Sequence, residues 1–215
     1  MTPNPRRFLL LASIGIALFA LLAVLLVTDS FLLRLDNWLA GHCYHYSIDH
    51  PRVHDFFLSI TDLGWSRFLN WVGAATLLLL LVRRDWIRGL IWTAGSVSMH
   101  QIVPFLKDQF QRPRPEFANI DGLSFPSGHA FGSAVVYGLL GILVLRIWQG
   151  SRWRLWFACA IWAIIPLVAV SRMMLGVHYF SDVLAGMCGG LACVFLIAAG
   201  ADAWDRRRES DAHTP

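Results

Sequence analysis

The chain has 215 residues, of which 56% are hydrophobic and 15% are charged, so it is more apolar than a soluble globular domain. The formal net charge is +4, but the arginines gather in alternate connecting segments and at both ends of the chain, a pattern that sets membrane topology. The sequence holds no basic stripe or groove-binding motif, which argues against a nucleic-acid-binding protein. These features predict an integral membrane protein without a nucleic-acid partner.

Six apolar runs are long enough to cross a hydrocarbon core as helices, at about 1.5 Å of rise per residue. They cover about residues 8–27, 60–82, 86–106, 127–148, 153–171 and 177–201. A turn near residues 62–64 interrupts the second run, and the polar, aromatic residues 28–55 suit a helix at the membrane interface. Gly186 and Gly190, four residues apart, predict close packing between helices. We therefore expect one all-α domain over residues 1–215, an integral membrane bundle of six transmembrane helices.

The charge pattern also predicts the orientation of the bundle. The arginine-rich segments face the cytoplasm, so both termini are cytoplasmic and residues 28–55, 107–126 and 171–178 face the other side. The first run has no clear small-residue cleavage site before Asp29, so we expect an uncleaved first helix in a multi-pass protein of the cytoplasmic (inner) membrane. We expect no disulfide, because Cys43 is alone on its side and the other cysteines lie in apolar runs.

The stretch from Ser171 to Asp182 places an arginine, a histidine and an aspartate at the entrance to the last apolar run. His178 and Asp182 are four residues apart and share one face of a helix that starts near Val177. The carboxylate can accept the Nδ1–H of the imidazole and leave Nε2 free as a nucleophile or base. Arg172 can supply a planar donor fork to an oxyanion. We interpret this stretch as half of a phosphate-binding site.

The other half of the expected site lies between the third and fourth apolar runs. Lys107 is the only lysine in the chain, and Arg114 follows it by seven residues. Ser127, Gly128 and His129 then open a helix, in which the serine can act as the cap and the glycine lets an anion approach the backbone N–H groups. A Ser-Gly-His start is common in ordinary helices, so this motif gains its weight from the other two.

Three motifs in order resemble the signature of the type 2 phosphatidic acid phosphatase (PAP2) superfamily, which also includes the vanadium haloperoxidases: Lys107-x6-Arg114-Pro115, Pro126-Ser127-Gly128-His129 and Ser171-Arg172-x5-His178-x3-Asp182. The resemblance implies a set of side chains that bind the phosphoryl oxygens: Lys107, Arg114, Ser127, Gly128 and Arg172. It also implies that His178 attacks phosphorus to give a phosphohistidine while Asp182 orients it. His129 would protonate the leaving group and then activate water.

The resemblance further implies an enzyme, a membrane phosphatase with its active site on the periplasmic side. We expect it to hydrolyse the terminal phosphate of a membrane lipid phosphate or diphosphate, such as undecaprenyl diphosphate, phosphatidate or phosphatidylglycerol phosphate. A lipid A phosphatase of the same superfamily is an alternative. A vanadate-dependent haloperoxidase fits less well because those enzymes are typically soluble, and a non-catalytic lipid-phosphate-binding protein needs no acid–nucleophile pair. We expect no metal or other cofactor, because cationic side chains and a helix N-terminus can replace a metal ion.

Two further groups of residues are not expected to take part in catalysis. Arg112 forms an Arg-Pro pair like Arg114, but only Arg114 has the family spacing from Lys107, so we expect Arg112 to contact lipid headgroups or the surface. The His-rich outer segment 42–54 suggests a metal site made of His42, His45 and Asp49, but no standard ligand motif is complete there.

Overall fold

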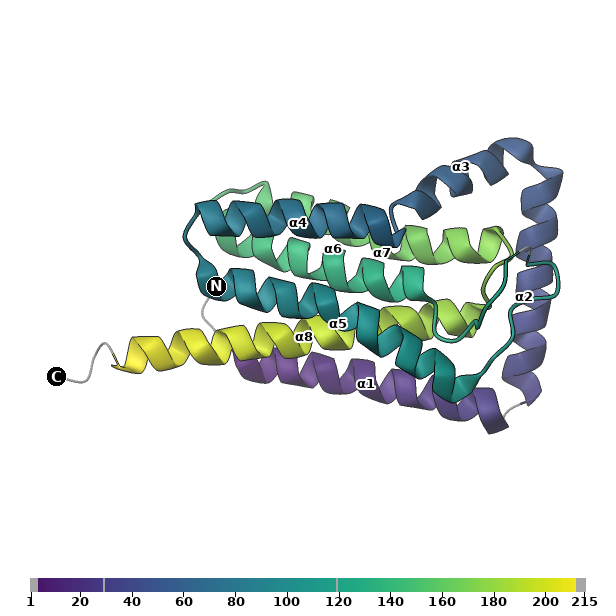
Figure 1. Cartoon of the computed structure of the whole chain (residues 1–215), viewed down its shortest axis with the longest axis horizontal. Coiled ribbons are helices and arrows are strands. Elements are labelled where there is room, and N and C mark those ends of the chain that lie inside the picture. Colours follow the sequence, from purple (N-terminus) through teal and green to yellow (C-terminus); the bar gives the residue numbers. More distant parts are fainter. Residues whose placement is uncertain (1–3, 29, 119, 212–215) are drawn as a thin grey trace.

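The computed structural model describes residues 4–28, 30–118 and 120–211, and within these ranges the regular secondary structure is entirely helical. The helices are α1 (Pro5–Thr28), α2 (Ser30–Asp49), α3 (Pro51–Asp62), α4 (Ser66–Val82), α5 (Trp86–Phe110), α6 (Gly128–Ile147), α7 (Arg154–Met174) and α8 (Phe180–Asp211). Helices α1 and α4 to α8 run along the long axis of the molecule, while α2 crosses one end of this bundle and α3 leads back from it (Figure 1).

Helix α6 forms the centre of the bundle, in contact with α4, α5, α7 and α8. It is apolar on all sides, as expected for a fully surrounded helix, and Phe131 and Val135 are buried in the main core. Helix α8 approaches it closely. A Cβ atom at Gly186 would lie 2.7 Å from the carbonyl oxygen of Ser127, and one at Gly190 would lie 2.6 Å from that of Phe131. The prediction of close helix packing at these two glycines is confirmed.

Among the described residues, α1, α6, α7 and α8 are long and apolar enough to cross a membrane. Helices α3 and α4 pass the same test together, bent by 44° at a short break that agrees with the turn predicted near residues 62–64. Helix α5 falls short because polar side chains such as His100 and Gln101 interrupt its apolar sequence. The fold is therefore an all-helical bundle with several candidate spans, and the count of six spans stays a prediction.

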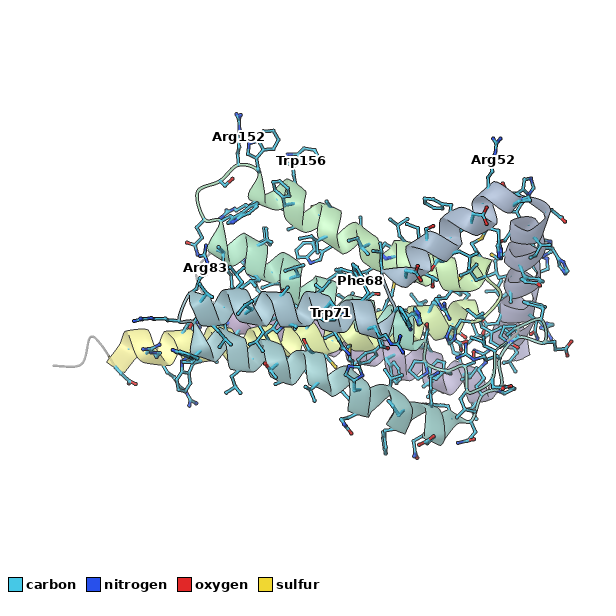
Figure 2. All side chains as sticks on the ribbon, turned by 45° about the horizontal axis from the view of Figure 1, so that its top comes forward. Arg52, Phe68, Trp71, Arg83, Arg152 and Trp156 are labelled. Atoms are coloured by element: carbon cyan, nitrogen blue, oxygen red, sulfur yellow. The ribbon has the colours of Figure 1, made fainter. Side chains whose placement is uncertain are left out.

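The outer surface of the bundle is apolar, as expected of a multi-pass membrane protein. Trp71 and Trp156 are 75% and 73% exposed and project away from the helices (Figure 2). Arg83 and Arg152 lie toward the end of the bundle opposite α2, whereas Arg52 lies near α2 (Figure 2). The first turn of α1 and the last turns of α8 also lie at the end away from α2 (Figure 1). This end carries most of the arginine-rich segments.

Helix α2 presents one face to the bundle, against α7 and α8. Leu32, Asp36 and Ala40 recur every four residues on that face and are all buried, while Trp38 is 56% exposed. The helix lies within residues 28–55, where one was expected, and its place at the membrane interface stays a prediction. It also carries a fully buried carboxylate to the end of the bundle where α6 and α8 begin.

The last helix begins later than the sequence suggests. We expected a start near Val177, but α8 begins at Phe180 and His178 lies in the turn between α7 and α8. The turn depends on Gly176, whose φ of +68° favours glycine. Asp182 accepts a hydrogen bond from the backbone N–H of Tyr179 at 2.9 Å, as in a capping box, and this bond fixes the first turn of the helix.

Candidate active site

The structure brings the predicted site residues to the end of the bundle that α2 crosses. This end contains the last turns of α5 and α7 and the first turns of α6 and α8 (Figure 1). His129 on α6 is close enough to the other basic groups of the motifs to interact electrostatically with each of them: Lys107, Arg114, Arg172 and His178. The backbone N–H of Ser127 donates to the carbonyl oxygen of Asp182 at 3.0 Å, which joins the starts of α6 and α8. Residues from five separate segments thus surround one small region.

His178 and Asp182 form a buried pair. The distance from Nδ1 of His178 to Oδ2 of Asp182 is 3.3 Å, and the two side chains are 2% and 0% exposed. Ser124 donates its hydroxyl to the same carboxylate oxygen. Burial lowers the pKa of His178 to about 4, even though the hydrogen bond and charge of Asp182 act to raise it. A pKa of about 4 leaves the imidazole neutral at pH 7. We assign its proton to Nδ1 because Nδ1 faces a carboxylate oxygen, which leaves the lone pair on Nε2.

The guanidinium of Arg114 lies directly in front of this lone pair. Its Nη1 is 3.2 Å from Nε2 of His178 and donates to the carbonyl oxygen of Val177 at 2.8 Å. Burial lowers the pKa of Arg114, and the charge of Asp182 opposes this effect. The position places a positive charge beside the atom expected to attack phosphorus.

Arg114 and Arg172 each carry a buried donor that the surrounding protein does not satisfy. Arg172 donates from Nη1 to Oγ1 of Thr61 at 2.8 Å, but the Nε of each arginine has no hydrogen-bond partner among the described residues. Leaving a buried donor unpaired costs about 1–3 kcal/mol, and more when the group is charged. A bound oxyanion within reach of either atom would supply the missing acceptor.

The start of α6 fits an anion in the same region. Ser127 has the extended backbone of an N-cap residue, and its Oγ accepts from the N–H of Ala130 at 3.5 Å. A Cβ atom at Gly128 would meet Val103 at an ordinary contact distance of 3.5 Å. Packing therefore does not require glycine at this position. The lack of a side chain instead leaves the backbone N–H groups open to a ligand.

Lys107 and His129 complete the predicted set. Nζ of Lys107 donates to the carbonyl oxygen of Leu123 at 2.6 Å and so holds the segment between α5 and α6. An ammonium group has three donors, so others remain for a ligand.

The His129 ring packs against the break between α3 and α4, where a Cβ atom at Gly64 would lie 3.1 Å from Cδ2 of His129. The bend in that helix pair therefore forms one wall of the site.

The prediction that Arg112 contacts headgroups or the surface is wrong. Its side chain is only 8% exposed and lies between two fully buried carboxylates. Nη1 donates to Oδ1 of Asp182 at 2.6 Å, and Nη2 donates to Oδ2 of Asp36 at 2.8 Å. The physical reason is that two buried carboxylates need a counter-charge, and Asp36 comes from a distant helix that motif spacing does not reveal.

Three further residues of the site were missed in the sequence. Thr61 and Ser124 bond to the motif residues Arg172 and Asp182, and Asp36 bonds to Arg112. One signal for this network was present in the sequence, because Arg112 precedes a proline as Arg114 does. Nothing local distinguishes the other three from ordinary polar residues.

The described hydrogen bonds of histidines in the His-rich segment stay within residues 38–54. Nδ1 of His42 bonds to the carbonyl oxygen of Trp38 at 2.9 Å, and Nδ1 of His54 bonds to Oγ of Ser47 at 3.0 Å. Within the described part of the chain, no group of three histidine, cysteine, aspartate or glutamate side chains is arranged to hold a metal ion. The metal hypothesis for His42, His45 and Asp49 therefore has no structural support.

Comparisons with known proteins agree with this geometry. Residues 88–206 match the family model of the PAP2 superfamily. Phosphatidylglycerophosphatase B from Bacillus subtilis strain 168 is 32% identical over 158 residues, which cover 70% of this chain and 76% of that protein. Decaprenylphosphoryl-5-phosphoribose phosphatase from Mycobacterium tuberculosis strain H37Rv is 33% identical over 118 residues, covering 50% of this chain and 56% of that protein.

A solved structure extends the similarity to most of the fold. The crystal structure of a transmembrane PAP2-type phosphatidylglycerolphosphate phosphatase from Bacillus subtilis has a TM-score of 0.78 and 25% sequence identity to this chain. The alignment covers 91% of this chain and 96% of that one. The motifs, the convergence of their residues and these similarities lead to one conclusion: the chain belongs to the PAP2 superfamily.

Proposed function

We propose that this protein is an integral membrane phosphatase that hydrolyses the terminal phosphate of a lipid phosphate or diphosphate. One observation carries the proposal: Nε2 of His178 lies 3.2 Å from Nη1 of Arg114, and both Arg114 and Arg172 hold a buried Nε without a partner among the described residues. This is a nucleophile next to an incomplete oxyanion site. The names of the relatives support the substrate class, because they describe phosphatases that act on lipids.

In the first half-reaction, Nε2 of His178 attacks phosphorus and the bond to the leaving oxygen breaks. His129 donates a proton to that oxygen. Charge in such a transition state lies on the equatorial phosphoryl oxygens, so catalysis depends mainly on positioning and electrostatic stabilisation. Lys107, Arg114 and Arg172 supply positive charge, and the N-terminus of α6 supplies N–H donors and a favourable dipole.

In the second half-reaction, His129 acts as a base. It takes a proton from a water molecule, whose oxygen attacks the phosphorus of the phosphohistidine. The N–P bond breaks, inorganic phosphate leaves, and His178 recovers its lone pair. Asp182 holds the imidazole through Nδ1 during both steps, so the same nitrogen faces phosphorus each time.

The position of the site supports a lipid substrate. The site lies at helix ends, at the end of the bundle opposite Arg83 and Arg152 (Figures 1 and 2). With arginine-rich segments in the cytoplasm, the site faces the periplasm at the level of the lipid headgroups. We propose a single domain over residues 1–215 in the cytoplasmic (inner) membrane, with six spans and both termini in the cytoplasm.

Phosphate release by the purified protein in detergent micelles tests this function. We expect activity on at least one of four substrate types, measured with EDTA present: undecaprenyl diphosphate, phosphatidate, phosphatidylglycerol phosphate and lipid A phosphates. Their relative rates identify the substrate. Activity that EDTA abolishes and a divalent metal restores would overturn the metal-independent mechanism. Halide oxidation that depends on added vanadate, without phosphate release, would favour the haloperoxidase.

Replacing His129 tests its role as acid and base. We expect His129→Ala to lower kcat by about 10²–10⁴-fold, the usual contribution of general acid–base catalysis. The loss in the first step should be smaller for an aryl phosphate, whose leaving group needs no proton. His100→Ala is the control, because His100 is an exposed histidine of α5 that bonds only to Asn70 in the described network. Equal losses in the two variants would contradict the assigned role.

The pH dependence of kcat/KM tests the state of His178. We expect kcat/KM to fall as the pH decreases through about 4, because protonation of Nε2 removes the nucleophile and burial holds the pKa of His178 near that value. The substrate also titrates, with a second phosphate pKa of about 6. Its titration is therefore measured separately by ³¹P NMR in the same micelles and subtracted. A corrected midpoint near 6.5, the ordinary value for histidine, would show that burial does not lower the pKa of His178.

A further inference from the structure

The carboxylate of Asp182 is held at both oxygens by different partners. Oδ2 faces His178 and accepts from the hydroxyl of Ser124 and the backbone N–H of Tyr179. Oδ1 accepts from Nη1 of Arg112 at 2.6 Å. Rotation of the carboxylate away from the imidazole would therefore break the bond to Arg112.

Arg112 is fixed in turn by a second carboxylate and an aromatic ring. Its Nη2 donates to Oδ2 of Asp36 at 2.8 Å, and its guanidinium lies 4.0 Å from the centre of the Tyr179 ring. The side chain is 8% exposed, so these contacts are shielded from water. A guanidinium is a planar fork of N–H donors, which lets one side chain bridge two carboxylates.

Asp36 connects this cluster to the start of α8. Its Oδ1 accepts from the backbone N–H of Ser181 at 2.9 Å, and its Oδ2 accepts from the hydroxyl of the same serine. A carboxylate from α2 therefore satisfies a free N–H in the first turn of α8, where negative charge is also favoured by the helix dipole. Asp36 fixes both Arg112 and the backbone next to Asp182.

We infer that Arg112 and Asp36 are positioning residues for the nucleophile. They hold the Asp182 carboxylate in the orientation that directs Nε2 of His178 toward phosphorus. The inference rests on the proposed function and adds two residues that lie outside the three sequence motifs. Neither side chain is expected to touch the substrate, because their hydrogen bonds are directed to Asp182, Ser181 and each other.

Removal of Arg112 has a predictable effect on His178. The charged groups that face this imidazole are Asp182 from α8, Arg172 from α7, Arg114 from the segment before α6, and His129 from α6 itself. Without Arg112, two buried carboxylates lose their shared counter-charge, and a proton on His178, whose Nδ1 is 3.3 Å from Oδ2 of Asp182, becomes more favourable. The other cations stay in place and oppose that proton to the same extent as before. The titration of His178 should therefore move to higher pH.

Arg112→Met is the first test. We expect kcat to fall at least about 100-fold with KM changed less than about threefold, because orientation is lost and phosphate binding is kept. We expect the acid-side midpoint of kcat/KM to rise by about one pH unit or more. Arg146→Met is the matched control: Arg146 forms a partly buried pair with Asp202, 14% and 8% exposed, at the opposite end of α6. It should change neither kcat nor the midpoint.

Two milder variants separate charge from orientation and keep the test available if Arg112→Met does not fold. Arg112→Lys retains the positive charge, but a compact ammonium cannot reproduce the bridge between two carboxylates. We expect its kcat to fall while the midpoint stays near the wild-type value. Asp36→Asn removes a negative charge, so its kcat should also fall but its midpoint should not rise.

A direct titration of His178 makes the result independent of the substrate. Hydrogen–deuterium exchange at the imidazole C2 position, read by mass spectrometry, gives the midpoint in wild type and in each variant. A higher titration midpoint of His178 in Arg112→Met than in wild type and Arg146→Met supports the inference. This holds even if no tested lipid is hydrolysed, because that result would count against the proposed function alone. Equal midpoints, or kcat in Arg112→Met equal to that of Arg146→Met, would overturn the positioning role even where phosphatase activity is present.

Discussion

His178→Ala is expected to lower lipid phosphate hydrolysis by roughly 10⁴–10⁶-fold, the scale seen when an enzyme loses its nucleophile. The physical reason is that Nε2 is the atom proposed to bond to phosphorus, and it lies 3.2 Å from Nη1 of Arg114. The measurement is kcat on the best lipid substrate. Brief reaction with a ³²P-labelled substrate should also give an acid-labile phosphoprotein in wild type and none in the variant.

The control for this loss is His42→Ala. His42 is an exposed histidine of α2, at the same end of the bundle, and its described bond is to the carbonyl oxygen of Trp38. We expect wild-type kcat from this variant, with and without EDTA. Thermal unfolding of both variants shows whether each is folded. Wild-type hydrolysis by folded His178→Ala would end the phosphohistidine mechanism, and labelled phosphoprotein in that variant would place the nucleophile elsewhere.

Asp182→Asn is expected to have the second largest effect, a loss of about 10⁴-fold in kcat, comparable to the same change in a serine protease triad. The neighbours of the carboxylate act as donors: Arg112, the backbone of Tyr179, Ser124 and Nδ1 of His178. An amide has only one acceptor oxygen, so its NH₂ must face at least one of these groups. If it faces the imidazole, the proton moves to Nε2 and the nucleophilic lone pair is lost.

This prediction is checked by kcat, by the tautomer of His178 in ¹⁵N NMR spectra, and by the free energy of unfolding. Breaking a buried ion pair costs about 3–5 kcal/mol, so the variant should also be less stable. Asp202→Asn is the matched control, because Asp202 is another buried aspartate of α8 and pairs with Arg146 at the far end. It should lose stability and keep kcat. A similar fall in kcat in the two variants would attribute the Asp182 effect to stability alone.

The sequence predicted the parts of the fold and site that depend on local patterns. Apolar runs of sufficient length predicted the helical bundle, and the four-residue spacing of His178 and Asp182 predicted their contact, although the helix begins after the histidine. The small residues Gly186 and Gly190 predicted the close approach of α8 to α6. Each of these rests on neighbours in the chain. The catalytic roles of the motif residues remain predictions.

Features that depend on distant contacts could not be predicted in the same way. Asp36 and Arg112 are 76 positions apart, and their bond forms only because α2 folds across the end of the bundle. Spacing from Lys107 selected Arg114 and left Arg112 without a role. The number of spans is open for a related reason: the polar residues of α5 lower its hydropathy, and composition alone does not say whether neighbouring helices shield them.

The reach of Asp36 to the first turn of α8 also has a consequence for biosynthesis. Asp36 leaves the ribosome 145 residues before its partner Ser181, an interval on the order of 10 s at about 5–20 residues per second. Arg112 follows Asp36 after 76 residues, so for about the first half of that time this carboxylate has neither partner, and for the rest it still lacks Ser181 on α8. Helix α2 and the start of α8 must therefore meet before the nucleophile can be aligned. A nascent chain that stops short of residue 181 cannot turn over substrate, however completely its earlier helices have inserted.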